Sequence, residues 1–293
     1  MPNLVKFKIK FELSNLWQVT ASSQQLQFHV TNKFPHSLPE NSFVANKSVL
    51  ACRIQDIFDK HIDFWNKLND FEFLELTIET PKGYNVILPF GSRYESRINK
   101  SKNLVKVRIP TKDFKNFVFY EGIIVHNEDF VEHRQAKNGY VVYTKNVRSQ
   151  MVELVLEVHN KALDFLRNII GETIYAQSVT VFVVDHNFPF KEDNMWSWGS
   201  CVIMKDYENV EHYPNSWYVC NLIHEFGHCY YAWSLIYGDF EVKERGAEMI
   251  KLYLSRELFP EYFNDYEKSN VINRLERREK YLIAAIENMA LNY

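Results

Sequence analysis

The segment 221–228 carries the pattern His-Glu-x-x-His, formed by His224, Glu225 and His228. Two residues four apart on an α-helix lie roughly 40° from each other around the axis and about one turn apart along it. Both imidazoles can therefore reach one tetrahedral cation at about 2.0–2.1 Å. Glu225 follows the first histidine, where its carboxylate can reach a water at the metal without binding the metal. The pattern thus predicts a helix that carries two zinc ligands and, in Glu225, a general base.

The residues around this pattern are apolar on most sides of the expected helix: Tyr218, Val219, Leu222, Ile223 and Phe226. Such a helix is buried or lines a cleft, where two unpaired histidines would be costly. We expect it to span 215–237, with Asn215 or Ser216 as its N-cap and Gly238 as its stop.

The two histidines leave a zinc site incomplete, because catalytic sites usually carry three protein ligands and a water. No histidine follows His228, so the third ligand must be a carboxylate, most plausibly on a helix expected at 240–258: Glu241, Glu244 or Glu248. A tight helical hairpin centred on Gly238 would place Glu248 level with His228. Glu244 instead begins a Glu-x-x-Ala pattern, in which Ala247 lets the two helices approach closely. Glu248 would then hydrogen-bond a ligand histidine from behind.

Composition limits the other classes of function. The 293 residues are 46% hydrophobic and 15% aromatic, which indicates an ordered globular protein, and the formal charge of −3 gives no case for nucleic-acid binding. The four cysteines lack the Cys-x-x-Cys spacing of a zinc site, so we expect reduced thiols. The first residues lack the apolar core of a signal peptide, and no apolar run approaches the length of a membrane helix. We therefore expect a cytoplasmic protein without a membrane partner.

Hydrophobic periodicity predicts an α+β protein in two domains, 1–145 and 146–293. The first is β-rich, with alternating residues at 5–11 and further strand signals. These signals lie at 16–30, 71–80, 84–90, 104–109, 117–125 and 140–144, and helical spacing occupies 48–68. His126 and His133 flank an acidic segment that we interpret as a polar surface loop.

The second half is expected to be mainly helical with a small sheet. Helical spacing covers 148–170, the apolar run 179–184 predicts a buried strand, and 196–204 predicts another strand with Gly199 allowing close backbone approach. The charged segment 261–293 is expected to be helical.

A zinc helix followed by a glutamate on the next helix resembles the gluzincin class of zinc peptidases, which implies a zincin-like catalytic domain. The stretch 239–247, Asp-Phe-Glu-Val-Lys-Glu-Arg-Gly-Ala, is similar to the Asp-Leu-Trp-Leu-Asn-Glu-Gly-Phe-Ala stretch of the aminopeptidase N family. That resemblance implies Glu244 as the zinc ligand. The alternative ligand, Glu248, has the spacing found in thermolysin-like peptidases.

The same family carries a Gly-x-Met-Glu-Asn motif whose glutamate holds the free amine of the substrate. Here Trp196 stands where that glutamate would be, so the amine anchor is missing, although Glu192 or Asp193 could substitute.

The expected function is a zinc-dependent metallopeptidase that hydrolyses peptide bonds in a peptide or protein substrate. Tyr262, Tyr266 and Tyr281 are candidates for holding the oxyanion, and the sequence does not choose among them. It assigns neither substrate-binding residues nor an oligomeric state. Two alternatives stay open: a degenerate zinc-binding homologue that acts as a scaffold or regulator, and an α+β interaction protein without metal.

Overall fold

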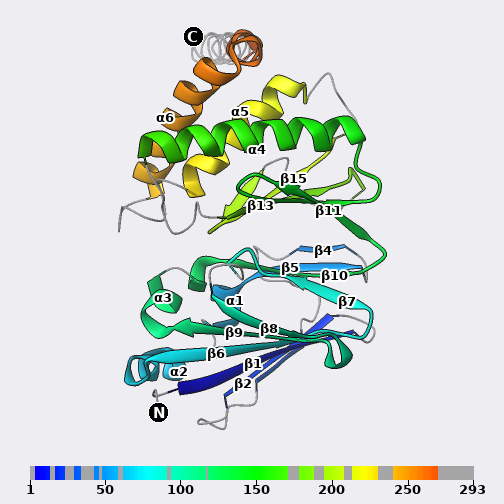
Figure 1. Ribbon diagram of the computed structural model, residues 1–293, viewed down its shortest axis with the longest axis vertical. Helices are drawn as coiled ribbons and strands as arrows, with labels where there is room; N and C mark the ends of the chain where they lie inside the picture. The colour runs from blue at the N-terminus through cyan, green and yellow to red at the C-terminus, as the bar shows by residue number, and fades with distance from the viewer. Residues whose placement is uncertain are drawn as a thin grey trace, which may run out of the picture.

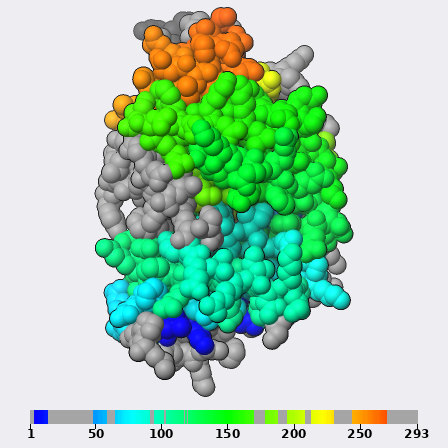
Figure 2. Space-filling model, in the orientation of Figure 1, coloured from blue at the N-terminus to red at the C-terminus, as the bar shows by residue number. Residues whose placement is uncertain are grey.

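A computed structural model describes residues 4–13, 17–23, 30–33, 43–45, 48–58, 62–90, 94–116, 118–170, 178–187, 195–207, 213–229 and 240–269. These residues form a mixed α/β structure with three sheets. Figure 1 shows the sheets stacked on one another, with helices α4, α5 and α6 above the last sheet. In the space-filling view of Figure 2, the residues of α6 and α4 likewise lie above those of the first two sheets.

The first sheet has six strands in the order β3-β2-β1-β6-β9-β8. Their bounds are β1 Leu4–Leu13, β2 Trp17–Ser23, β3 Val30–Lys33, β6 Phe73–Glu79, β8 Glu95–Asn99 and β9 Leu104–Pro110. In β1 the apolar residues of the predicted alternation are buried, whereas the intervening lysines are less so. A strand with one buried and one wet face was expected here, and it is confirmed.

The second sheet has the order β4-β5-β10-β7 and packs on the first through a shared apolar core. Its strands are β4 Phe43–Ala45, β5 Val49–Arg53, β7 Tyr84–Ile87 and β10 Gly122–Asn127. Three short helices accompany these strands: α1 Ile54–Phe58, α2 Ile62–Lys67 and α3 Thr111–Asn116.

The predicted helix 48–68 is wrong in its first part, because Val49–Arg53 is strand β5. Leu50 and Cys52 face the core shared with the first sheet, while Val49 and Ala51 face the third sheet. A strand buried on both faces is apolar at every position, so its sequence also fits one turn of a buried helix. The helical part begins only at Ile54.

The third sheet has the order β11-β12-β13-β15-β14. The bounds are β11 Val131–Ala136, β12 Gly139–Thr144, β13 Val179–Val184, β14 Trp196–Trp198 and β15 Cys201–Lys205. Every residue of the central strand β13 is buried, as predicted for 179–184. Alternate residues face the helices on one side and the second sheet on the other.

Two predictions near this sheet are corrected. The segment 196–204 is a hairpin rather than one strand, because Gly199 adopts φ +56° and turns the chain between β14 and β15. His126 is not on a surface loop: it is 7% exposed within β10, between β5 and β7. The acidic residues 128–129 do form a turn, and His133 lies exposed on β11.

The hairpin β11–β12 precedes the predicted domain boundary at 145, yet β12 pairs in parallel with β13 beyond it. The two halves also share an apolar core, to which β5 and β10 contribute from one half and β13 and β15 from the other. The division into two domains therefore stays a proposal. The third sheet contains strands from both sides of the proposed boundary.

Helices α4 Ser149–Ile170, α5 Asn215–Gly227 and α6 Phe240–Leu258 cover the outer face of the third sheet (Figure 1). Their apolar stripes and the facing valines of β13 form the third core. The helices at 148–170 and 240–258 are confirmed, and residues 260–269 continue as helix. The N-cap of α5 is Pro214, not Asn215 or Ser216.

Several predictions fall on residues outside the described part of the chain: the end of the helix expected at 215–237, the stop at Gly238, and the helix beyond 269. Within the described residues, no helix is both long enough and apolar enough to cross a membrane. The four cysteines are buried and free, as expected.

His159 generates a prediction about the pH dependence of stability. It is fully buried on α4, its Nε2 donates to the carbonyl of Val179 at 2.9 Å, and its ring meets Phe226 edge-on. Among the described residues, its Nδ1 has no hydrogen-bond partner, and burial lowers the pKa of His159 to about 4. At neutral pH the imidazole of His159 is uncharged in both the folded and the unfolded protein. Because its pKa is lower in the folded protein, the unfolded chain takes up a proton first, and the free energy of unfolding decreases as pH falls from about 6.5 towards 4.

We expect the free energy of unfolding of the native protein to drop by about 2 kcal/mol more between pH 7 and pH 5 than that of His159→Gln. Urea unfolding at the two pH values measures this difference. The exposed His133→Gln is the control and should follow the native protein. Equal drops in the native protein and His159→Gln would contradict the interpretation.

Candidate metal centre

The site lies where α5 crosses α6, and two small residues set the distance between these helices. A Cβ atom placed on Gly227 would lie 2.9 Å from Cα and 3.3 Å from Cβ of Ala247. Real Cβ atoms do not approach backbone this closely, so only glycine fits at 227. The predicted role of Ala247, to let the two helices approach, agrees with this contact.

The close approach brings three potential ligands together: His224, His228 and Glu244. The two Nε2 atoms lie 3.1 Å apart, and each lies 3.3 Å from an oxygen of Glu244, Oε2 for His224 and Oε1 for His228. Ligands bound to a tetrahedral zinc ion at 2.0–2.1 Å are about 3.3–3.4 Å apart. These three residues could therefore hold a metal ion.

Glu225 lies beside this cluster but faces a different environment. It is 8% exposed, and burial raises the pKa of Glu225 to about 7, although the nearby His224 and a hydrogen bond with Ser197 partly oppose the rise. Ser197 belongs to β14, the edge strand of the third sheet. A glutamate with a pKa near neutrality can both accept and return a proton at physiological pH.

Glu248 lies behind the first histidine rather than with the three potential ligands. Its Oε2 lies 3.3 Å from Nδ1 of His224, within ion-pair range although not aligned as a hydrogen bond. Contact with His224 lowers the pKa of Glu248 to about 2, helped by Lys251 and opposed by burial. The sequence left Glu244 and Glu248 open as ligands. The structure places Glu244 against both Nε2 atoms and Glu248 against the other nitrogen of His224.

The sequence did not single out Lys251, which lies one turn beyond Glu248 on the same side of α6. Its side chain is 8% exposed, and its Nζ contacts Oε2 of Glu248 at 2.6 Å and the hydroxyl of Tyr266 at 3.1 Å. Burial lowers the pKa of Lys251, but its bonds to Glu248 and Tyr266 outweigh burial and raise the net value. The spacing of three from Glu248 was the available signal in the sequence.

The first half of the chain fixes the edge strand beside Glu225. The fully buried carboxylate of Glu121 accepts bonds from the backbone N–H of Ser200 at 2.9 Å and from its hydroxyl at 2.9 and 3.0 Å. A Cβ atom on Gly199 would lie 2.5 Å from that carboxylate, so the predicted close backbone approach is present. Trp198 is buried in the core below, and Trp196 packs against it.

The candidates for an oxyanion-holding tyrosine are only partly placed. The hydroxyl of Tyr266 contacts Lys251, and Tyr262 packs on the core beneath the helices. Tyr281 lies outside the described residues, as do Glu192 and Asp193, the possible substitutes for an amine anchor.

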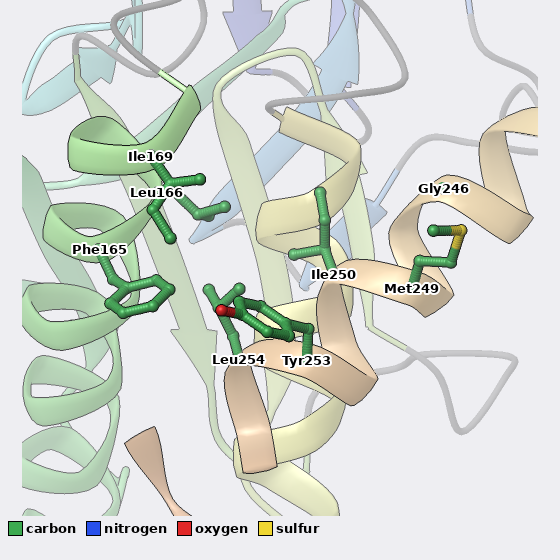
Figure 3. Close-up of a pocket in the computed structure, with 8 residues that line it drawn as sticks. All are labelled: Phe165, Leu166, Ile169, Gly246, Met249, Ile250, Tyr253 and Leu254. Carbon is green, nitrogen blue, oxygen red and sulfur yellow. The ribbon is translucent and has the colours of Figure 1, made fainter. Parts of the chain in front are cut away.

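An apolar hollow of about 240 Å³ lies on the other face of α6, between that helix and the end of α4 (Figure 3). Its α6 residues are 246, 249, 250, 253 and 254, roughly half a turn around the helix from 244, 248 and 251. The hollow is therefore separate from the candidate metal centre.

No protein-family model matches this chain, and none of the curated proteins matches it. Among solved structures, the chain is similar to an aminopeptidase N family protein from Idiomarina loihiensis, with 10% identity and a TM-score of 0.48. The match covers 77% of this chain and 47% of that one, so this chain spans about half the length of its structural neighbour. A likeness at this level identifies neither a family nor an activity.

The Gly227–Ala247 contact predicts that Gly227→Ala destabilises the protein by about 1–2 kcal/mol. Overpacking costs about 1–3 kcal/mol, and the higher helix propensity of alanine returns up to about 1 kcal/mol. Urea unfolding of the metal-free protein measures the change. Met249→Ala, on the exposed face of α6, is the control and should stay within about 0.5 kcal/mol of the native protein. A gain in stability for Gly227→Ala would contradict this interpretation, because it would show that α5 and α6 accommodate the added methyl group without strain.

Proposed function

We propose that this chain is a zinc-dependent metallopeptidase, in which His224, His228 and Glu244 bind zinc and Glu225 is the general base. One observation carries the proposal: the Nε2 atoms of His224 and His228 lie 3.1 Å apart and each lies 3.3 Å from one oxygen of Glu244. The buried carboxylate of Glu225 lies beside them on the same helix as the histidines. Zinc is favoured over calcium or magnesium because two of the three donors are imidazole nitrogens. A peptide or protein is the proposed substrate, with no nucleic-acid or membrane partner.

The proposed chemistry divides between the metal and Glu225. A zinc ion in this site would supply an activated water and polarise the scissile carbonyl. Glu225 would accept the proton of the attacking water and deliver it to the leaving amine. Ser197 interacts with the carboxylate of Glu225 and favours its charged form, and the third sheet presents β14 as an edge strand next to α5.

Exposure supports this division of roles. The side chains of His224 and His228 are 15% and 12% exposed, and that of Glu244 is 39% exposed, so a substrate can reach this side of the cluster. A degenerate homologue that binds zinc without turnover is the second candidate. The missing amine anchor at Trp196 favours it, whereas the intact Glu225 favours the enzyme.

The ligand assignment predicts different outcomes for the two glutamates of α6. Glu244→Ala should lose nearly all zinc, because two protein ligands remain, whereas Glu248→Ala should keep zinc with an affinity about 10–100-fold lower. Elemental analysis and competition with a chromophoric chelator measure both. Glu257→Ala, at an exposed position near the end of α6, is the control. If only Glu248→Ala empties the site, the assignment is wrong.

The role of Glu225 predicts a separation of metal binding from turnover. Glu225→Gln should retain one zinc per chain and lose peptide hydrolysis by at least about 100-fold, since the amide cannot accept the proton. A panel of peptides with free and blocked N-termini measures turnover and also separates exopeptidase from endopeptidase action. Metal binding without cleavage of any peptide by the native protein would favour the degenerate homologue. Absence of bound metal would overturn both candidates.

A further inference from the structure

A line of contacts runs from the first histidine to the helix that follows α6. Nδ1 of His224 lies 3.3 Å from Oε2 of Glu248, and the same oxygen lies 2.6 Å from Nζ of Lys251. That Nζ lies 3.1 Å from the hydroxyl of Tyr266. Since Nε2 of His224 faces Glu244 and His228, its two ring nitrogens face the potential ligands on one side and this line on the other.

The members of this line differ in how firmly they are held. The side chain of Glu248 is 44% exposed, so on its own it could turn into solvent and leave His224. The side chain of Lys251 is only 8% exposed and lies over the ring of Tyr266, with Nζ 5.0 Å from the ring centroid. A buried ammonium group must keep its partners, because leaving it unpaired is costly. The buried lysine therefore selects the orientation of Glu248 that faces His224.

We infer that Lys251, supported by Tyr266, is a positioning residue that holds Glu248 against His224 and thereby sets the metal affinity of the site. The inference rests on the proposed function in that His224 is taken as a zinc ligand. Partners behind a ligand histidine fix its tautomer and orientation, and their loss typically lowers metal affinity 10–100-fold. Here Glu248 orients His224 and Lys251 orients Glu248. The effect of Lys251 on zinc affinity should therefore depend on Glu248.

The test measures zinc affinity by chelator competition in Lys251→Met, Glu248→Gln and the double variant. We expect Lys251→Met to bind zinc about tenfold more weakly than the native protein. In the Glu248→Gln background, Lys251→Met should cause no further loss. Tyr266→Phe leaves the Lys251–Glu248 pair in place and should lose less than about threefold. Lys268→Met is the matched control, because Lys268 is 75% exposed and lies on the next helix.

A second measurement needs no metal and does not depend on turnover. In the metal-free protein, ¹⁵N chemical shifts of the histidine ring report which nitrogen carries the proton. A carboxylate held 3.3 Å from Nδ1 favours the tautomer with the proton on that nitrogen. His224 should therefore be Nδ1-protonated in the native protein and a mixture of tautomers in Lys251→Met. Lys251→Gln, which keeps a polar group in the buried position, serves if Lys251→Met does not fold.

The outcomes separate this inference from the proposed function. A native protein that binds no zinc overturns the proposed function, and an unchanged tautomer of His224 would then overturn the inference on its own. A native protein that binds zinc, together with an unchanged affinity in Lys251→Met, overturns the inference alone. An equal loss in the native and Glu248→Gln backgrounds shows that Lys251 acts by another route, which also overturns it.

Discussion

The close contact between Gly227 and Ala247 is the constraint on which the rest of the site depends. A glutamate side chain is short, so Glu244 meets both imidazoles only if the backbones of α5 and α6 nearly touch. Ala247 follows Glu244 by three residues and therefore lies on the same side of α6. The next residue, Glu248, lies on that side as well and meets the other nitrogen of His224. One small-residue contact thus places two carboxylates against one histidine.

The layers beneath the helices hold this contact in place. The strand β13 is buried on both faces, so it joins the helices above to the second sheet below. Glu121, from the first half of the chain, binds the turn of the β14–β15 hairpin, and β14 carries Ser197 to Glu225. A buried carboxylate without these bonds would be costly, so the edge strand and the first half of the chain are fixed together. The β-rich half therefore contributes to the site, although it supplies none of its potential ligands.

The sequence predicted what is periodic or chemically distinctive. Helices α4 and α6 and strands β1 and β13 follow from apolar spacing, and His224 and His228 follow from their separation of four on one helix. The errors share a cause, since periodicity does not report tertiary environment. Residues 49–52 of β5 are all apolar because sheets lie on both sides of them. The hairpin at Gly199 depends on a left-handed turn, which a single glycine in the sequence does not predict. Glu244 and Glu248 could not be separated because that choice depends on how closely two helices pack.

The burial of the two acidic side chains separates their chemistry where the sequence alone does not. Glu225 and Glu244 both lie at the histidine cluster, yet Glu225 is 8% exposed and the side chain of Glu244 is 39% exposed. Burial disfavours the charged form, so Glu225 gains affinity for a proton, as a group that shuttles protons requires. Glu244 is more exposed, and its two oxygens face the two imidazoles. The same residue type therefore has two different environments on two neighbouring helices, and these environments support the two roles that we propose.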